Sequence, residues 1–142
     1  MVVVKFNEIE WDGTKMKGKS FEVKDKVDVE GIISMARKAV QKLDDGVRYD
    51  YLKALREFRK FMMAFWEAKE SKKARDWLDV DNAEISIYRM DINVVLPIKT
   101  KNLSGGYVIP GEILEPFWKT WGNKFDIVPG KDIIAIYGGV KE

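Results

Sequence analysis

The stretch DYLKALREFRKFMMAFWEAKESKKARDWL, residues 50–78, is the longest helical pattern in the chain. At about 100° per residue its apolar side chains gather on one stripe, which is the pattern of a helix packed against a core. After Trp66 the stripe becomes polar, so we expect the last turns to extend past the core into solvent. The apolar stripe consists of Tyr51, Leu55, Phe58, Met62, Phe65 and Trp66, with Leu52 at its margin.

A second row of side chains lies at the margin of this stripe. Its members recur at intervals of three and four residues, so they form one ridge along the helix. Guanidinium and indole groups can stack on planar ligands. The ridge consists of Arg56, Arg59, Met63 and Trp66, and Lys69 and Lys73 continue the helix with basic side chains.

Composition limits the class of protein. A chain of 142 residues with 46% hydrophobic and 34% charged residues predicts one globular domain, residues 1–142. Cysteine and histidine are absent, which excludes disulfides, the usual zinc ligands and a Ser-His triad. Neither an apolar run of membrane-spanning length nor a leader is visible, so we expect a cytoplasmic protein without a membrane span.

Charge is unevenly distributed along the chain. The net charge is +2, but residues 1–78 hold 18 Lys and Arg against 14 Asp and Glu, whereas residues 79–142 hold 7 against 9. The basic half is compatible with a polyanionic partner, although it falls short of the strong patches of duplex-binding proteins. Abundant Lys and Glu, with no cysteine, are also typical of hyperthermophile proteins.

The N-terminal third predicts a hairpin and a helix. Val2–Trp11 and Ser20–Lys24 have the pattern of two paired strands. Asp28 is the expected N-cap of a helix that ends near Asp45, with Gly46 as its stop signal. Because Asp50 then caps the long helix after a short link, we expect the two helices to be antiparallel neighbours.

The second half alternates strands with one short helix. Glu84–Lys99 has a period of two residues and predicts one long strand. The whole chain therefore predicts an α+β domain of order ββααββαββ, an antiparallel sheet packed on one face by two long helices. The remaining expected elements are a turn at residues 104–106, a strand Tyr107–Ile109, a helix Glu112–Trp121 ending at Gly122, and strands Phe125–Val128 and Ile133–Tyr137.

Two patterns suggest metal chemistry, and both have a simpler interpretation. Asp12 followed by Glu22-Val23-Lys24 resembles a Mg²⁺-dependent nuclease signature, in which carboxylates hold the metal and the lysine orients water. No proline precedes Asp12 and the usual leading helix is missing, so a hairpin with charged outer positions is the favoured interpretation. The acids of residues 79–84 match no defined metal loop, and we expect neither a metal nor a cofactor.

A local resemblance covers residues 105–132. Gly106-Tyr-Val-Ile-Pro-Gly-Glu-Ile113 and Pro129-Gly-Lys-Asp132 resemble the AbrB-like swapped-hairpin DNA-binding fold, in which a strand leads into a short helix and then another strand. Where that family has arginines, this chain has Gly106 and Leu114. The resemblance therefore implies shared geometry more than shared duplex contacts.

Aromatic residues make up 12% of the chain, and several lie beside Lys or Arg. Proteins hold single strands in this way, since bases stack on rings while basic groups bind phosphates. Together with a helix-covered sheet and the hyperthermophile-like composition, this pattern resembles the archaeal ThermoDBP-related single-stranded nucleic-acid-binding proteins. That resemblance implies a sheet–helix cleft that binds DNA or RNA without a cofactor and with little sequence preference.

We therefore expect a binding protein for single-stranded DNA or RNA, not an enzyme, with bases against the long helix and the open sheet face. A Mg²⁺-dependent nuclease and a structural protein of a mobile element are the alternatives. Whether the chain forms a homodimer stays open. The candidate contact residues are the ridge and its lysines, Arg56, Arg59, Met63, Trp66, Lys69 and Lys73, and further along the chain Tyr88, Arg89, Trp118 and Trp121.

Overall fold

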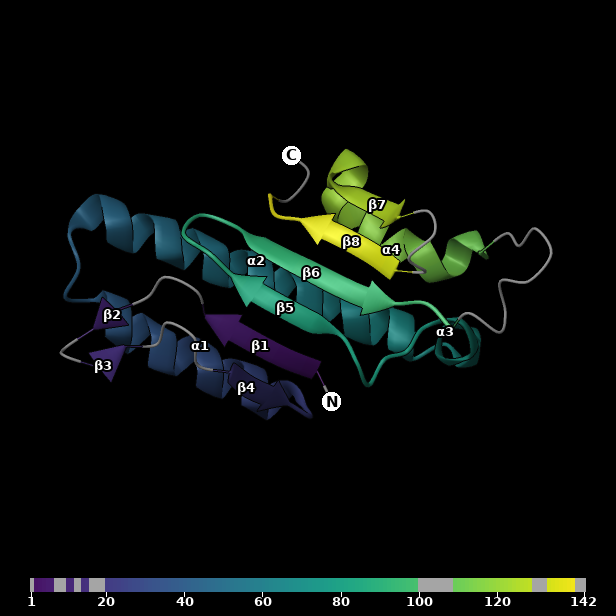
Figure 1. The fold of residues 1–142 in the computed structure, drawn as a ribbon, viewed down its shortest axis with the longest axis horizontal. Helices are drawn as coiled ribbons and strands as arrows, with labels where there is room; N and C mark the ends of the chain where they lie inside the picture. The colour runs from purple at the N-terminus through teal and green to yellow at the C-terminus, as the bar shows by residue number, and fades with distance from the viewer. Residues whose placement is uncertain are drawn as a thin grey trace.

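The computed structural model describes residues 2–6, 10–11, 14–15, 20–99, 109–128 and 133–139 (Figure 1). Groups of strands alternate with groups of helices along the chain. The elements are β1 (Val2–Phe6), β2 (Glu10–Trp11), β3 (Thr14–Lys15), β4 (Ser20–Val23), α1 (Lys26–Val40), α2 (Asp45–Lys69), α3 (Lys72–Trp77), β5 (Glu84–Ile87), β6 (Ile92–Pro97), α4 (Gly111–Trp121), the 3-10 turn η2 (Gly122–Lys124), β7 (Phe125–Val128) and β8 (Ile133–Tyr137).

Six strands form one mixed sheet in the order β4-β1-β5-β6-β8-β7, and β2 and β3 pair separately. The prediction of an α+β fold is confirmed. The prediction of a wholly antiparallel sheet is wrong, because β1 and β5 run parallel. The helices between β4 and β5 form a crossover, which brings β5 beside β1 in the same direction. The predicted order also lacked β2, β3 and α3.

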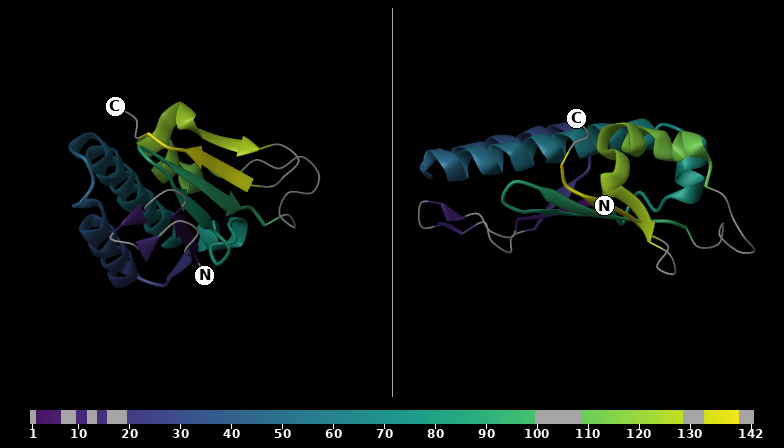
Figure 2. Two further views of the ribbon diagram at one scale, coloured as in Figure 1. Left: turned by 60° about the vertical axis from the view of Figure 1, so that its left-hand side comes forward. Right: turned by 90° about the horizontal axis from the view of Figure 1, so that it is seen from above.

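The helices α1, α2 and α4 lie on one face of the sheet (Figure 2). Helix α2 is the middle one: it contacts β5 and β6, with α1 on one flank over β4 and α4 on the other flank over β7. Alternate strand residues point into this layer, and none of the described helices lies on the opposite face of the sheet. The buried strand residues are Val2, Val4, Phe6, Val23, Ile85, Ile87, Ile92, Val94, Leu96, Ile134 and Ile136.

The predicted long strand at residues 84–99 is instead a hairpin of β5 and β6. Tyr88 donates its backbone N–H to the carbonyl of Asp91 at 2.9 Å, and Met90 takes a left-handed φ of 80°. This turn reverses the alternation of inward and outward positions. Ile87 and Ile92 therefore face the core together, although one continuous strand would place them on opposite faces.

The helix boundaries also differ from the sequence signals. Asp25, not Asp28, is the N-cap of α1, and Asp28 completes a capping box three residues later. Helix α1 ends at Val40, and α2 begins at Asp45, five residues before the predicted cap at Asp50. Gly46 is not a stop signal but the second residue of α2, where packing of the long helix outweighs the low helix propensity of glycine.

The long helix does not continue to Leu78. Ser71 is extended, with ψ of 129°, so α2 ends at Lys69 and the short helix α3 follows. The predicted extension into solvent is wrong, because Ala74 and Leu78 are buried and the segment folds back against β6. The backbone N–H of Asp79 donates to Pro97, and that of Lys99 donates to Trp77, at 2.9 and 2.8 Å.

The C-terminal elements largely agree with prediction. Helix α4 ends at Gly122, which has a φ of 56°, and β7 and β8 pair as expected. Pro116 lies at the sixth position of α4, beyond the first turn, where a helix tolerates proline most readily. The predicted turn at residues 104–106 and most of the strand Tyr107–Ile109 lie outside the described residues. No helix in the described ranges has both the length and the apolarity to cross a membrane.

Candidate nucleic-acid interface

The outer side of the helical layer carries a groove between α1 and α2, which we call the inter-helix groove. It consists of four adjoining hollows of about 290, 370, 280 and 270 Å³, taken in order from the α3 end. Each hollow shares lining residues with the next, so the four hollows form one row along the two helices. The shared residues, in the same order, are Lys26, Trp66 and Glu70, then Glu30 and Arg59, then Arg37 and Gln41.

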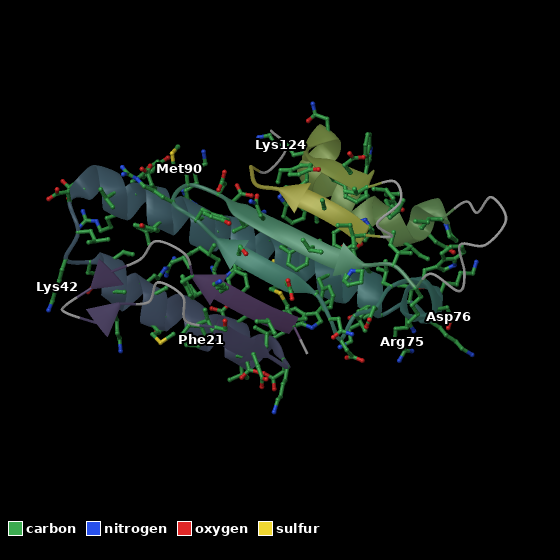
Figure 3. All side chains as sticks on the ribbon, in the orientation of Figure 1. Phe21, Lys42, Arg75, Asp76, Met90 and Lys124 are labelled. Carbon is green, nitrogen blue, oxygen red and sulfur yellow. The ribbon has the colours of Figure 1, made fainter. Side chains whose placement is uncertain are left out.

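Antiparallel packing of α1 and α2 explains why charged residues line this groove. Both helices bury one stripe, and the polar margins of the two stripes meet at the outer surface. Arg75 lines the end near α3, and Figure 3 shows it at the opposite end of the molecule from Lys42, which follows Gln41. The basic lining residues are Lys26, Arg37, Lys38, Arg48, Arg56, Arg59, Lys69 and Arg75, and the acidic ones are Glu30, Glu67 and Glu70.

The section around Trp66 mixes both charges with apolar surface. The Lys26 ammonium lies 5.9 Å from the centroid of the partly buried Trp66 ring, within the range of a cation–π contact. Arg59 donates from Nη2 to Glu30 at 2.8 Å, while its Nε is buried without a hydrogen-bond partner. Met63 is 61% exposed beside them. This section offers an aromatic surface and an unused donor.

The opposite end of the groove is basic throughout. Arg37, Arg48 and Arg56 line one hollow with Val40, Gln41 and Leu52, and no acid is among its described lining residues. Arg48 reaches the carboxylate of Asp45 at 2.7 Å, and the Arg56 guanidinium lies 5.9 Å from the ring centroid of Tyr49. An anion bound in this hollow would be attracted by all three guanidinium groups. We call this section the arginine end.

The structure brings five of the predicted contact residues together. Arg56, Arg59, Met63, Trp66 and Lys69 all line the inter-helix groove. The predicted ridge is therefore the α2 wall of the groove. The second wall, contributed by α1, had not been identified from the sequence.

The other five predicted residues lie elsewhere. Lys73 forms an ion pair with Glu112 of α4 at 2.9 Å, and Arg89 forms one with Asp50 at 2.7 Å. The partly buried Tyr88 is at the β5–β6 turn. Trp118 is exposed on α4, the helix on the other side of α2 from the groove.

Trp121 corrects the prediction most clearly. Its side chain is fully buried, so its ring belongs to the core and has no face for a base. Its centroid is 6.2 Å from that of Phe61. The indole Nε1 is buried without a hydrogen-bond partner. Trp121 is therefore not part of the candidate interface.

The groove also contains residues that the sequence analysis missed. The available signal was on α1, which carries the basic residues Lys26, Arg37 and Lys38, together with the expectation that the two helices are antiparallel. Combining the two would have placed α1 side chains opposite the ridge. The missed basic residues are Lys26, Arg37, Lys38, Arg48 and Arg75.

The open sheet face is the other surface that was predicted to bind bases. Tyr137 is 50% exposed there and lies across from Asn93, which gives this face one accessible ring. The described strand positions on this face hold one basic residue, Lys5. They hold three acidic residues, Glu22, Glu84 and Asp126. A phosphate chain would meet net negative charge on this face, so the groove is the better candidate.

The nuclease alternative depends on Asp12, which lies outside the described residues. Glu22 is exposed on the open sheet face, and the backbone N–H of Lys24 donates to Asp28 at 2.7 Å. Within the described ranges, no three acidic side chains gather into a metal-binding group. The residues of the AbrB-like resemblance are partly outside these ranges too, namely 105–108 and 129–132.

Comparisons of the chain with protein-family profiles, with curated proteins and with solved structures found no match. The geometry of the groove is therefore the basis for assigning a function.

Proposed function

We propose that the protein binds single-stranded nucleic acid along the inter-helix groove. The observation that carries this proposal is the row of four adjoining hollows along the groove, lined by eight described basic residues against three acidic ones and with Trp66 in its wall. Basic side chains bind the phosphates of a strand, and an accessible ring stacks on a base at ~1–3 kcal/mol.

The width of the groove favours a single strand over a duplex. Packed helices have axes about 8–10 Å apart, so the groove between them is narrow. A duplex is far wider, since its major groove alone, about 12 Å across, admits a whole helix. A single strand, in contrast, can enter the groove with its bases turned inward.

The two ends of the groove have different roles in this proposal. The arginine end binds phosphates, because guanidinium groups bind phosphate in a bidentate manner and, of its three arginines, Arg37 and Arg56 have no described carboxylate partner while Arg48 is paired with Asp45. The section around Trp66 receives a base, because it combines a ring, two methionines and several charged side chains.

A titration with labelled strands of about 12 nucleotides, within the size range of known single-strand sites, tests the proposal. We expect DNA and RNA strands to bind at low salt, and a duplex of the same length to bind much more weakly. Failure of every single strand to bind would contradict the proposal and favour a structural role. Shortening of the strand in the presence of Mg²⁺ would favour the nuclease alternative.

Charge variants show whether the groove is the site. Arg37→Gln together with Arg56→Gln removes two groove charges, whereas Lys5→Gln together with Lys124→Gln removes two charges from other surfaces and serves as the control. We expect only the first pair to weaken binding. Equal weakening by both pairs would show that the net charge of the protein, and not the groove, controls affinity.

A further inference from the structure

The hollow around Trp66 differs from the rest of the groove because it contains every groove acid. Glu30, Glu67 and Glu70 line it, against two basic residues, Lys26 and Arg59. At about 370 Å³ it is the size of a small-ligand site. The surplus of carboxylates repels phosphate, so this hollow suits the uncharged part of a nucleotide, its base.

The three carboxylates are not equally engaged. Glu30 is held by Arg59 at 2.8 Å. Glu67 acts on Lys119: the pKa of that lysine is raised, chiefly by its hydrogen bond to Glu115 and in small part by Glu67. Glu70 lies one turn beyond Trp66 and lines the hollows on both sides of the ring. Glu70 is therefore the main acceptor available beside the aromatic surface, because Glu67 also interacts with Lys119 on α4.

We propose that this hollow selects guanine, an inference that rests on the proposed function. An ionised carboxylate accepts hydrogen bonds and donates none. Guanine presents two adjacent donors on its Watson–Crick edge, N1–H and the N2 amino group, which match the two oxygens of one carboxylate. Adenine and cytosine present an amino group beside a ring acceptor, and thymine or uracil presents one N–H between two carbonyls. Each of these bases sets an acceptor against the carboxylate.

The other edge of guanine complements the basic side of the same hollow. Its O6 and N7 are acceptors that arginine or lysine bonds preferentially among the bases. Arg59 and Lys26 both line this hollow, and the Arg59 side chain is 38% exposed, so both residues can supply donors to these acceptors. Guanine thus brings donors for Glu67 and Glu70 and acceptors for Arg59 and Lys26. This specificity contrasts with the low sequence preference that the ThermoDBP-related resemblance implies.

Alternating strands test the selectivity directly. Thymine–guanine repeats should bind about tenfold more tightly than thymine–cytosine repeats of equal length, and than thymine strands with adenine at every third position, which are used because alternating thymine–adenine would pair with itself. Thymine–inosine repeats keep N1–H but lose the N2 amino group, so their affinity should fall between the two. Equal affinity for all four repeats would overturn the guanine proposal and leave strand binding intact. Failure of all four to bind would overturn the proposed function itself.

Carboxylate variants locate the selectivity. Glu67→Gln combined with Glu70→Gln should bring the guanine-to-adenine affinity ratio close to one, because an amide presents a donor where guanine needs an acceptor. Glu84→Gln on the open sheet face is the matched control and should leave the ratio unchanged. If the double variant keeps the guanine-to-adenine affinity ratio of the unaltered protein, the assignment of guanine selection to this hollow is overturned. If equimolar GMP displaces the guanine strand, the hollow selects guanine as a mononucleotide site. That result would overturn strand binding.

Discussion

Helix α2 has two flanks, and both contain aromatic rings. On the flank toward α4, the Phe61 ring stacks near Phe117 with centroids 6.1 Å apart, and Trp121 closes the junction. On the flank toward α1, Trp66 is only partly buried, beside hollows with charged walls. Both junctions are helix–helix contacts of the same helix. Aromatic content therefore does not identify a binding surface, whereas accessibility together with charge does.

The largest effect should come from the closed flank. Trp121→Ala would leave a large cavity among Phe61, Phe117 and the sheet, so we expect a loss of ~3–5 kcal/mol of unfolding free energy. Denaturant unfolding measures this loss. Trp118→Ala is the matched control, because its exposed ring should change stability by no more than about 0.5 kcal/mol. Similar losses for the two variants would contradict the difference in burial.

The open flank should show the opposite behaviour. Trp66→Ala should weaken binding of a single strand by ~1–3 kcal/mol, because it removes the stacking surface of the groove. Fluorescence anisotropy with a labelled strand measures the change, and the melting temperature shows whether the variant stays folded. Trp118→Ala should leave affinity unchanged. If it weakened binding as much as Trp66→Ala, the site would extend to α4.

The arginine end should control salt dependence more than affinity. For single strands, log K falls with log[salt] by about 0.7 for each phosphate contact, and we expect a slope of about −2 to −3 for the protein. Arg56→Gln should make the slope shallower by about 0.7. Titrations at several salt concentrations measure it. An unchanged slope would exclude a phosphate contact at Arg56.

The smallest effect concerns the ion pair across the groove. Arg59 and Glu30 are 38% and 60% exposed, and exposed pairs contribute ~0–1 kcal/mol, so Arg59→Ala should change stability little. The same variant should weaken strand binding, because it removes a guanidinium from the groove. A double-mutant cycle with Glu30→Gln separates the two effects. Lost stability with unchanged affinity would assign Arg59 to the fold alone.

Periodicity predicted the elements better than their ends. The buried stripe of α2 from Tyr51 to Phe65 is present, as are α4, β7 and β8. The local signals at helix boundaries were less informative. Asp25 and Asp28 are both residue types that favour the N-cap position, and only the hydrogen bonds between them show which one caps α1. Choosing between them requires the backbone geometry.

Two failures had a tertiary cause. The strands β5 and β6 were merged because each alternates correctly by itself, and only the shared burial of Ile87 and Ile92 reveals the turn between them. Half of the groove was missed for a similar reason. A sequence pattern describes one helix surface, whereas the groove exists only where α1 and α2 meet, so Arg37 and Arg56 had no evident relation before packing was known.

The parallel pairing of β1 with β5 affects how the chain can be synthesised and folded. Val4 lies opposite Ile85, so β1 lacks this neighbour until α1, α2 and α3 have all been translated. Until then α2 lacks β5 and β6, the two strands of the sheet that it contacts. Contacts between residues so distant in sequence slow folding and prolong the exposure of apolar surface. The nascent N-terminal half is therefore the stage at which this protein is most exposed to aggregation and most dependent on chaperones.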